Sequence, residues 1–360
     1  MKLLCIAALI GLTCCCFKNY NQYTRDICHA LKAKPYIKLD NSKFGALIEG
    51  TSVNPSGQIF AVNFGSNYST NQLGQIYPEQ KLIFKDDRLK SFLNAIRFIN
   101  STTAFAADAA NHHILKLKID PVTNLVVESS IFCSDPTMIQ PNDLVLSSTG
   151  YIFTSGMRSI DNNTSTDGDI WVCSPSGQAK RLALLGRTNG IELSPKEDYL
   201  YVSESYNLFR KPIVQKVWRY KVNVHTGEIS SPALWIDFGK FDNSSRNDVD
   251  GMRADVYGNL FITRHGKGEV KVFNPNAENI ATISLSFPRP TNLEFGGLKG
   301  STLFIAGQCP EFPIEEIGMG CMDSIDLESQ GAGYSRISIT TPNYKYPSPY
   351  HSNMPSNLRV

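Results

Sequence analysis

One pattern of hydrophobic and polar positions recurs along the chain. A polar residue is followed by a short apolar segment, a turn with Gly, Pro or Asp, and a second segment rich in Phe, Tyr, Ile and Val. The pattern is clearest over 49–62, 142–155, 189–202 and 250–263. We call the polar residues that begin the six copies the anchors: Glu49, Asn94, Asn142, Asn189, Asp250 and Asn292. They are spaced 45, 48, 47, 61 and 42 residues apart, and such a period with several short strands is typical of a β-propeller.

Each copy predicts a sheet of four short strands. In the third copy the strands are expected at 143–147, 151–155, 169–173 and 178–184. The sixth copy supplies three, at 293–295, 302–306 and 334–339, and no fourth strand follows it. An unpaired strand at 35–39 precedes the first copy. We expect this strand to complete the sixth blade, which would leave the ring without exposed sheet edges.

The sequence therefore predicts an all-β fold, a six-bladed β-propeller with four-stranded blades over residues 35–341. Residues 342–360 are rich in Pro, Ser, Asn and Tyr and are expected to form a loosely ordered tail. A β-sandwich is the alternative, but a sandwich would not repeat at this period. The composition agrees with many short strands and tight turns, since Tyr and Phe total 34 and Gly and Pro total 45.

Charge and hydrophobicity exclude two classes of protein. Hydrophobic residues make up 42% and charged residues 19% of the chain, so a sizeable core forms and global disorder is excluded. The net charge is +2 and no basic run is present, which argues against nucleic acid as a partner.

The N-terminus resembles a targeting segment. Met1-Lys2 precedes an uncharged apolar run over 3–16 that ends before Lys18. A membrane span needs about 20 apolar residues, so we interpret 1–16 as a secretory signal peptide. The alternatives are a buried strand or helix and a bacterial lipoprotein signal, but no Cys follows a Leu-Ala-Gly type box. We expect a secreted protein with no membrane attachment after cleavage.

Other features agree with secretion. Asn-x-Ser/Thr sequons, which are glycosylation sites in secreted proteins, occur at Asn67, Asn100, Asn162, Asn163 and Asn243. Five cysteines remain after cleavage: Cys28, Cys133, Cys173, Cys309 and Cys321. Because five is odd, not all of them can pair within the chain. Cys309 and Cys321 bracket one loop and are the best candidate disulfide, and the pairing of the other three stays open.

The anchors predict a metal site. The first strand of each blade lines the channel of a propeller, so the anchors converge there. All six carry a side-chain oxygen, and two carboxylates among amides suit a hard cation such as Ca²⁺. No anchor is His or Cys, which argues against zinc as the native ion. The alternative is that Asn and Asp cap turns at the strand starts.

Several segments also resemble a known family. Arg-Thr-Asn-Gly-Ile-Glu-Leu-Ser-Pro at 187–195, Asp-Gly-Met-Arg-Ala-Asp at 250–255 and Pro-Thr-Asn-Leu-Glu-Phe-Gly-Gly at 290–297 are similar to the senescence-marker-protein/gluconolactonase/luciferin-regenerating-enzyme family. The resemblance covers about 35–340 and implies a six-bladed propeller that binds one divalent metal and often hydrolyses lactones. It implies Ca²⁺, with Mn²⁺, Mg²⁺ or Zn²⁺ as substitutes. The metal ligands that it implies are Glu49, Asn142, Asn189 and Asp250.

The resemblance also implies roles for individual residues. Asp250 matches the proposed catalytic base, although a role as ligand alone is equally compatible. Asn142 approaches both metal and substrate, and Gln140 stands where regucalcin-like members have a substrate-binding Arg. A second departure is Thr51, which replaces the Pro of Glu-Gly-Pro. Related paraoxonases use histidines near their calcium, so His112 and His265, both expected in loops at the rim of the site, are further candidates for substrate binding.

Two functions follow from these observations. The first is a secreted metal-dependent hydrolase of a small lactone or related ester, of gluconolactonase type. The alternative is a non-catalytic binding propeller, or a strictosidine-synthase-like relative, in which calcium only stabilises the ring. No feature of the sequence points to a particular oligomeric state.

Overall fold

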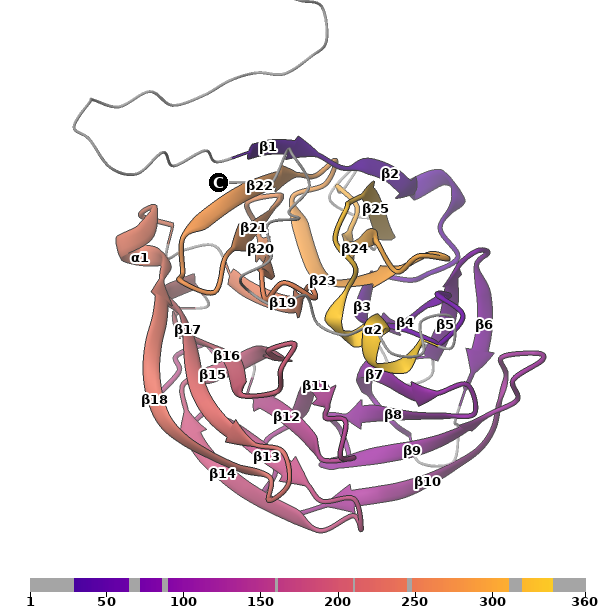
Figure 1. The fold of residues 1–360 in the computed structure, drawn as a ribbon, viewed down its shortest axis with the longest axis horizontal. Helices are drawn as coiled ribbons and strands as arrows, with labels where there is room; N and C mark the ends of the chain where they lie inside the picture. The colour runs from indigo at the N-terminus through magenta and orange to yellow at the C-terminus, as the bar shows by residue number, and fades with distance from the viewer. Residues whose placement is uncertain are drawn as a thin grey trace, which may run out of the picture.

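The protein is a ring of six β-sheets around a central axis (Figure 1). The computed structural model describes residues 29–64, 72–85, 90–158, 161–209, 211–244, 248–310 and 319–338. The expected signal peptide at 1–16 and the expected tail at 342–360 lie outside the described residues. Within them, no helix is long and apolar enough to cross a membrane.

The first three blades each consist of four consecutive antiparallel strands. Blade one contains β3 (Leu47–Val53), β4 (Ile59–Phe64), β5 (Gln72–Tyr77) and β6 (Lys81–Phe84). Blade two contains β7 (Leu93–Asn100), β8 (Thr103–Asp108), β9 (His113–Ile119) and β10 (Val126–Ser134). Blade three contains β11 (Pro141–Leu146), β12 (Ile152–Met157), β13 (Gly168–Cys173) and β14 (Ala179–Leu185).

The last three blades complete the ring. Blade four contains β15 (Arg187–Leu193), β16 (Tyr199–Leu208), β17 (Lys211–Asn223) and β18 (Glu228–Asp237). Blade five contains β19 (Asp248–Ala254), β20 (Leu260–His265), β21 (Glu269–Phe273) and β22 (Asn279–Ser284). Blade six contains β23 (Arg289–Gly296), β24 (Thr302–Gln308), β25 (Gly320–Asp326) and the N-terminal β2 (Lys34–Ile37). The six-bladed, four-stranded propeller expected from the sequence is confirmed.

The N-terminal segment closes the ring as the sequence predicts. β2 pairs antiparallel with β25 and places Lys34 opposite Ser324. A second N-terminal strand, β1 (His29–Lys32), was not expected. It pairs in parallel with β22 and adds a fifth strand to blade five. Two outer edges are therefore covered by residues that precede the first repeat.

The predicted position of the third strand of blade six, at 334–339, is wrong. The strand is β25, at Gly320–Asp326, whereas Ala332–Ile337 forms the short helix α2. Apolar Tyr334 and Ile337 are three residues apart, which suits one face of a helix. Tyr334 is buried against a core that includes Phe304, and its hydroxyl donates to the carbonyl oxygen of Leu298 at 3.1 Å.

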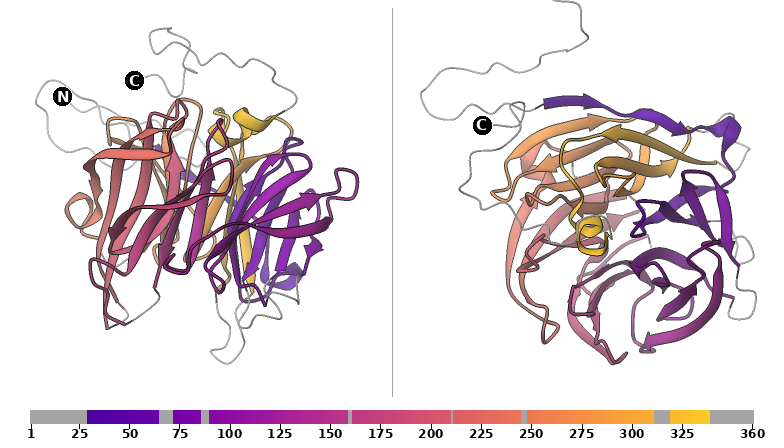
Figure 2. Two further views of the ribbon diagram at one scale, coloured as in Figure 1. Left: turned by 90° about the horizontal axis from the view of Figure 1, so that it is seen from below. Right: turned by 45° about the vertical axis from the view of Figure 1, so that its right-hand side comes forward.

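The core lies between neighbouring blades. Outer strands alternate, as in β9, where Leu115 and Leu117 are buried while Lys116 and Lys118 are exposed. Inner strands are buried on both faces, as throughout β15. The helix α2, yellow in Figure 2, lies at one face of the ring near the ends of β7, β19 and β23. A shorter helix, α1 (Phe238–Phe241), follows β18.

Two disulfides join parts of this framework. Cys309 pairs with Cys321, as the sequence predicts, and Cys133 pairs with Cys173. The second bond links β10 of blade two to β13 of blade three. Cys28 lies outside the described residues.

Candidate functional site

The anchors lie near the start of the innermost strand of each blade, beside an irregularity in strand pairing. Register shifts occur next to Glu49 in β3, Asn142 in β11 and Asp250 in β19. The other inner strands have the same feature at Asn94, Asn189 and Asn292. A β-bulge re-aims side chains and breaks the regular alternation. The bulges explain how the six anchors can point toward the channel from strands that are buried on both faces.

Glycines that follow two anchors bring neighbouring inner strands into close contact. A Cβ at Gly190 would overlap the carbonyl oxygen of Asp250. A Cβ at Gly251 would lie 2.8 Å from the Cα of Asn292. Only glycine leaves room for this approach, so blades four, five and six converge at the level of the anchors.

Three of the four expected metal ligands are buried polar residues without a hydrogen-bond partner for the side chain. Asn142, Asn189 and Asp250 are 7%, 5% and 7% exposed. None of the three side chains makes a hydrogen bond to another residue in the described parts of the chain. None of their polar atoms is among the fully buried atoms that lack a partner, so these oxygen atoms still reach solvent and are available to a ligand.

The carboxyl groups of Glu49 and Asp250 both have raised pKa values. Burial raises the pKa of Glu49 to about 8 and the charge of Asp143 adds to this, although the Gly50 N–H donates to Glu49 Oε2 at 3.2 Å. Burial also raises the pKa of Asp250 well above its usual value, and the charge of Glu49 raises it further. A divalent cation with oxygen ligands would relieve this repulsion.

The residues present fit such a cation. Among the described residues, no three His, Cys, Asp or Glu side chains gather into a group that could hold a metal ion. The candidate set contains only two carboxylates, and its other oxygens come from the amides of Asn142 and Asn189. Oxygen-only donors of this kind suit calcium and not a zinc site built from His and Cys.

A network of buried ion pairs lies further along the inner strands. Arg97 Nη2 donates to Asp143 Oδ1 at 2.5 Å, and Arg253 Nη1 lies 3.5 Å from Asp143 Oδ2. Arg253 also lies 3.0 Å from Glu294 and 3.7 Å from Glu192. These five residues come from blades two to six, so the network connects the inner strands across the axis. We call it the axial network.

A small cavity of about 270 Å³, here the mouth cavity, opens beside the anchors. Its lining residues are Phe64, Phe92, Asn94, Ala109, Ala110, Gln140, Asn142 and Met157. Glu49, Asn189 and Asp250 are not among them. The cavity therefore presents a mainly apolar wall, with amides at one side, next to Asn142.

The four residues expected to bind substrate do not share one cavity. Gln140 and Asn142 line the mouth cavity together. His112 lines a neighbouring cavity instead, where its Nδ1 lies 2.5 Å from the carbonyl oxygen of Met138. His265 ends β20, where burial lowers its pKa and Asp248 opposes that shift. Neither histidine lines the mouth cavity.

An ion pair near Asp250 was not singled out by the sequence. Arg187 Nη2 bonds to Asp248 Oδ2, and Arg187 Nε donates to Ser205 Oγ at 2.9 Å. The charge of Arg187 acts on Asp250 and lowers its pKa, against the larger effects of burial, Glu49 and Asp248. Arg187 and Asp248 each lie two residues before an anchor, the spacing that also separates Gln140 from Asn142. That spacing is the signal that could have found them.

Most of the expected glycosylation sites are accessible. Asn100, Asn162 and Asn243 are exposed, Asn163 is partly exposed, and Asn67 lies outside the described residues. Asn100 Oδ1 accepts hydrogen bonds from the N–H and the hydroxyl of Thr102, at 2.9 and 3.0 Å. The sequon at Asn100 therefore forms a compact turn on the surface.

Sequence comparisons identify relatives over part of the chain. A gluconolactonase of Zymomonas mobilis is 31% identical over 215 residues, which are 56% of this chain and 57% of that protein. An uncharacterized protein of Sulfolobus acidocaldarius is 30% identical over 119 residues, 33% of this chain and 39% of that protein. The chain thus aligns with less than two thirds of the length of either relative.

Solved structures share the fold at low identity. Regucalcin of Agrobacterium tumefaciens, described as a calcium-binding protein, has a TM-score of 0.66 at 16% identity, covering 84% of this chain and 96% of its own. A luciferin-regenerating enzyme gives the same TM-score and identity, with coverage of 83% and 96%. A gluconolactonase of Xanthomonas campestris gives 0.59 at 15% identity, with coverage of 84% and 99%.

A family model covers more than half of the chain. Residues 94–308 match the SMP-30/gluconolactonase/LRE-like region, a span that includes Asn142, Asn189 and Asp250 and begins after Glu49. The fold, the anchors and this match agree: the chain belongs to the SMP-30/gluconolactonase/LRE-like family.

Proposed function

We propose that this protein is a secreted, metal-dependent hydrolase of lactones or related esters, with Ca²⁺ as its metal. The observation that carries the proposal is the set of side-chain oxygens without hydrogen-bond partners on the largely buried residues Asn142, Asn189 and Asp250, next to the carboxylate of Glu49. Membership of a family that contains gluconolactonases supports the choice of lactones as the substrate class.

The four residues would hold one divalent metal. When bound, such an ion supplies a Lewis acid that stabilises negative charge on a carbonyl oxygen. Asp250 would accept the proton of the attacking water, for which its carboxylate must be ionised. Burial, Glu49 and Asp248 oppose that ionisation, and Arg187 favours it less strongly. The charge of a bound divalent metal would therefore be needed to keep Asp250 ionised.

The mouth cavity would position the substrate. Gln140 and Asn142 offer amide donors and acceptors for ring or hydroxyl oxygens. Phe64, Phe92 and Met157 form an apolar wall, which would exclude water from the reacting group and hold the carbon skeleton of a lactone.

A panel of lactones and aryl esters tests the activity. The protein is assayed after chelation and after addition of Ca²⁺, Mn²⁺, Mg²⁺ or Zn²⁺. We expect turnover of lactones that chelator abolishes and Ca²⁺ restores. Turnover that persists in chelator would exclude the metal mechanism. Calcium-dependent stabilisation without turnover of any substrate would favour the non-catalytic binding propeller.

Secretion is tested in cultured eukaryotic cells. The full chain is expected in the medium without residues 1–16 and with a mass that falls on treatment with an N-glycosidase. Replacement of Asn100 by Gln should remove one glycan. Retention of an unglycosylated full-length chain inside the cell would contradict this part of the proposal.

A further inference from the structure

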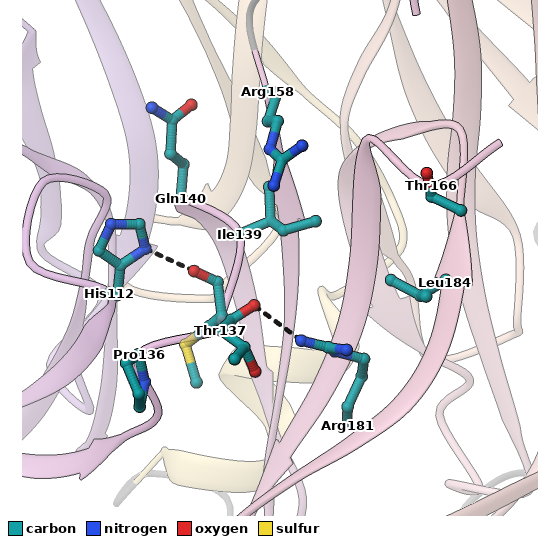
Figure 3. Close-up of a pocket in the computed structure, with 10 residues that line it drawn as sticks. His112, Pro136, Thr137, Ile139, Gln140, Arg158, Thr166, Arg181 and Leu184 are labelled. Carbon is teal, nitrogen blue, oxygen red and sulfur yellow. Dashed lines mark hydrogen bonds between the residues drawn. The ribbon is translucent and has the colours of Figure 1, made fainter. Parts of the chain in front are cut away.

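A second cavity, of about 700 Å³, neighbours the mouth cavity, and Figure 3 shows the side chains that line it. We call it the side cavity. Three segments form it: the loop before β9, through His112, the linker 135–140 between blades two and three, and blade three itself, through Arg158, Thr166 and Arg181. Its volume lies within the range of small-molecule sites, about 300–1,000 Å³.

The side cavity and the mouth cavity share Gln140. Gln140 has a φ of 29°, and its carbonyl oxygen accepts a hydrogen bond from Met157 N at 3.4 Å. The preceding residue, Ile139, donates its N–H to Asp169 Oδ2 at 3.0 Å. The linker is thus attached to blade three, and Gln140 stands at the boundary between the two cavities.

Apart from His112, the ionisable side chains that line the side cavity are two arginines, Arg158 and Arg181. The side chains of Arg158 and Arg181 are 57% and 32% exposed, whereas those of their acidic partners Asp167 and Asp169 are 6% and 0% exposed. The carboxylates of Asp167 and Asp169 lie behind the surface, so the cavity itself presents the guanidinium groups. Asp135, at the start of the linker, also interacts with Arg181 but does not line the cavity.

The two arginines are held in place by weak ion pairs. Arg158 Nη1 lies 3.5 Å from Asp167, and Arg181 Nε lies 3.8 Å from Asp169. Arg181 also stacks on the ring of Trp171 at 5.0 Å. Figure 3 shows its hydrogen bond from Nη2 to the carbonyl oxygen of Thr137, at 2.8 Å. Because these pairs are longer than a charged hydrogen bond, an anionic ligand could form shorter ones.

We propose that the side cavity is a substrate subsite that takes an anionic appendage, such as a carboxylate, attached to the lactone or ester whose reacting group occupies the mouth cavity. This inference rests on the proposed function. The mouth cavity has room for a small ring, and the neighbouring volume, reached past Gln140, receives the rest of the molecule. Guanidinium groups bind carboxylates through paired, charge-assisted hydrogen bonds, so Arg158 and Arg181 would select the charged substrate.

A pair of matched lactones tests the subsite. One is a δ-lactone with an alkyl side chain, and the other has a side chain of the same length that ends in a carboxylate. In the wild-type protein the ratio of kcat/KM for the charged over the neutral lactone should exceed one. Arg158→Gln should lower this ratio by about 10- to 100-fold, the effect of losing a hydrogen bond between charged groups. Arg181→Lys should lower it less than Arg181→Gln, because it keeps the charge.

Lys180→Gln is the matched control. Lys180 neighbours Arg181 on β14, is 64% exposed in its side chain and pairs with Glu228 at 3.6 Å, outside the side cavity. The control should leave the ratio unchanged. A wild-type ratio near one, or a ratio that Arg158→Gln does not change or that Lys180→Gln lowers as much, would overturn the subsite.

Calorimetry separates this inference from the proposed hydrolase. If neither lactone is turned over, the proposed function fails, and binding of the two lactones to wild type and Arg158→Gln decides the subsite. Tighter binding of the charged lactone that the variant loses would support it. Equal binding of both lactones to the wild-type protein would overturn it.

Discussion

Glu49 of blade one and Asp250 of blade five lie close enough that the charge of Glu49 raises the pKa of Asp250. The two residues are 201 positions apart in the sequence, but only blade six lies between their blades in the ring. Repulsion between buried carboxylates is costly unless a cation or a proton offsets it. This pair therefore provides a way to separate metal binding from chemistry.

Asp250→Asn and Glu49→Gln should differ in their response to metal. Both variants remove one negative charge and keep a side-chain oxygen, so both should bind Ca²⁺ more weakly. Glu49→Gln leaves the proposed base in place, and excess Ca²⁺ should restore part of its turnover. Asp250→Asn should lose about 10²–10⁴-fold in turnover, the usual contribution of a positioned base, and excess metal should not restore it.

Steady-state lactone hydrolysis as a function of Ca²⁺ concentration measures both effects. Glu228→Gln, which changes a carboxylate that is 64% exposed on the outer surface, is the control and should behave as wild type. If saturating Ca²⁺ returns Asp250→Asn and Glu49→Gln to similar turnover, Asp250 is only a ligand.

Much of the ring could be predicted because its repeat is carried by local pattern. The expected strands at 169–173 and 178–184 agree with β13 and β14 within one residue at each end. The first strand of the same blade, expected at 143–147, begins earlier, at Pro141. The anchor Asn142 lies inside the strand because a bulge accommodates it, and alternation alone does not reveal a bulge.

The rest depends on contacts that local pattern does not specify. β1 is only four residues long, and no residue in it is fully buried, so its sequence does not mark it as a strand. Its partner, β22, lies some 250 positions away in the sequence. In the site, the anchors could be found, but the axial network could not. Its members come from five blades, and only the placement of Arg97, Glu192 and Arg253 three residues after an anchor hints that they share a level of the ring.

Removal of the N-terminal strands should destabilise the ring. A chain that begins at Asn41 lacks β1 and β2, so the edges of β22 and β25 lose their partners. Its melting temperature should fall sharply below that of the full chain. A chain that ends at Pro342 keeps all strands and α2 and should melt near the full chain. Equal melting temperatures of the two shortened chains would contradict closure by β2.

The two disulfides should contribute unequally. Cys133–Cys173 closes a loop with a sequence separation of 40, and Cys309–Cys321 closes one of 12. Loop-closure entropy then gives stabilisations of about 4 and about 3 kcal/mol, respectively. The double replacement Cys133→Ser with Cys173→Ser should therefore lower the free energy of unfolding more than Cys309→Ser with Cys321→Ser. Chemical denaturation compares them, and the opposite order would show that native contacts outweigh loop length.

The last prediction concerns Glu192 in the axial network. Burial raises the pKa of Glu192 to about 8, although Arg336, 3.6 Å away, acts in the opposite direction. A carboxyl whose pKa is raised in the folded state stabilises the fold below its usual pKa of about 4.3. That contribution is lost as the pH rises through about 8.

Glu192→Gln has nearly the shape of the protonated acid and does not ionise. Its stability relative to wild type should therefore increase from pH 5 to pH 8, because the unfolded wild-type chain ionises at this position while the folded protein still holds the proton. Urea denaturation across that range gives the difference in free energy of unfolding. Glu128→Gln is the control, because the Glu128 side chain is 66% exposed and pairs only loosely with Lys118, at 3.7 Å. A difference between Glu192→Gln and wild type that stays constant with pH would mean that the axial arginines keep Glu192 ionised throughout.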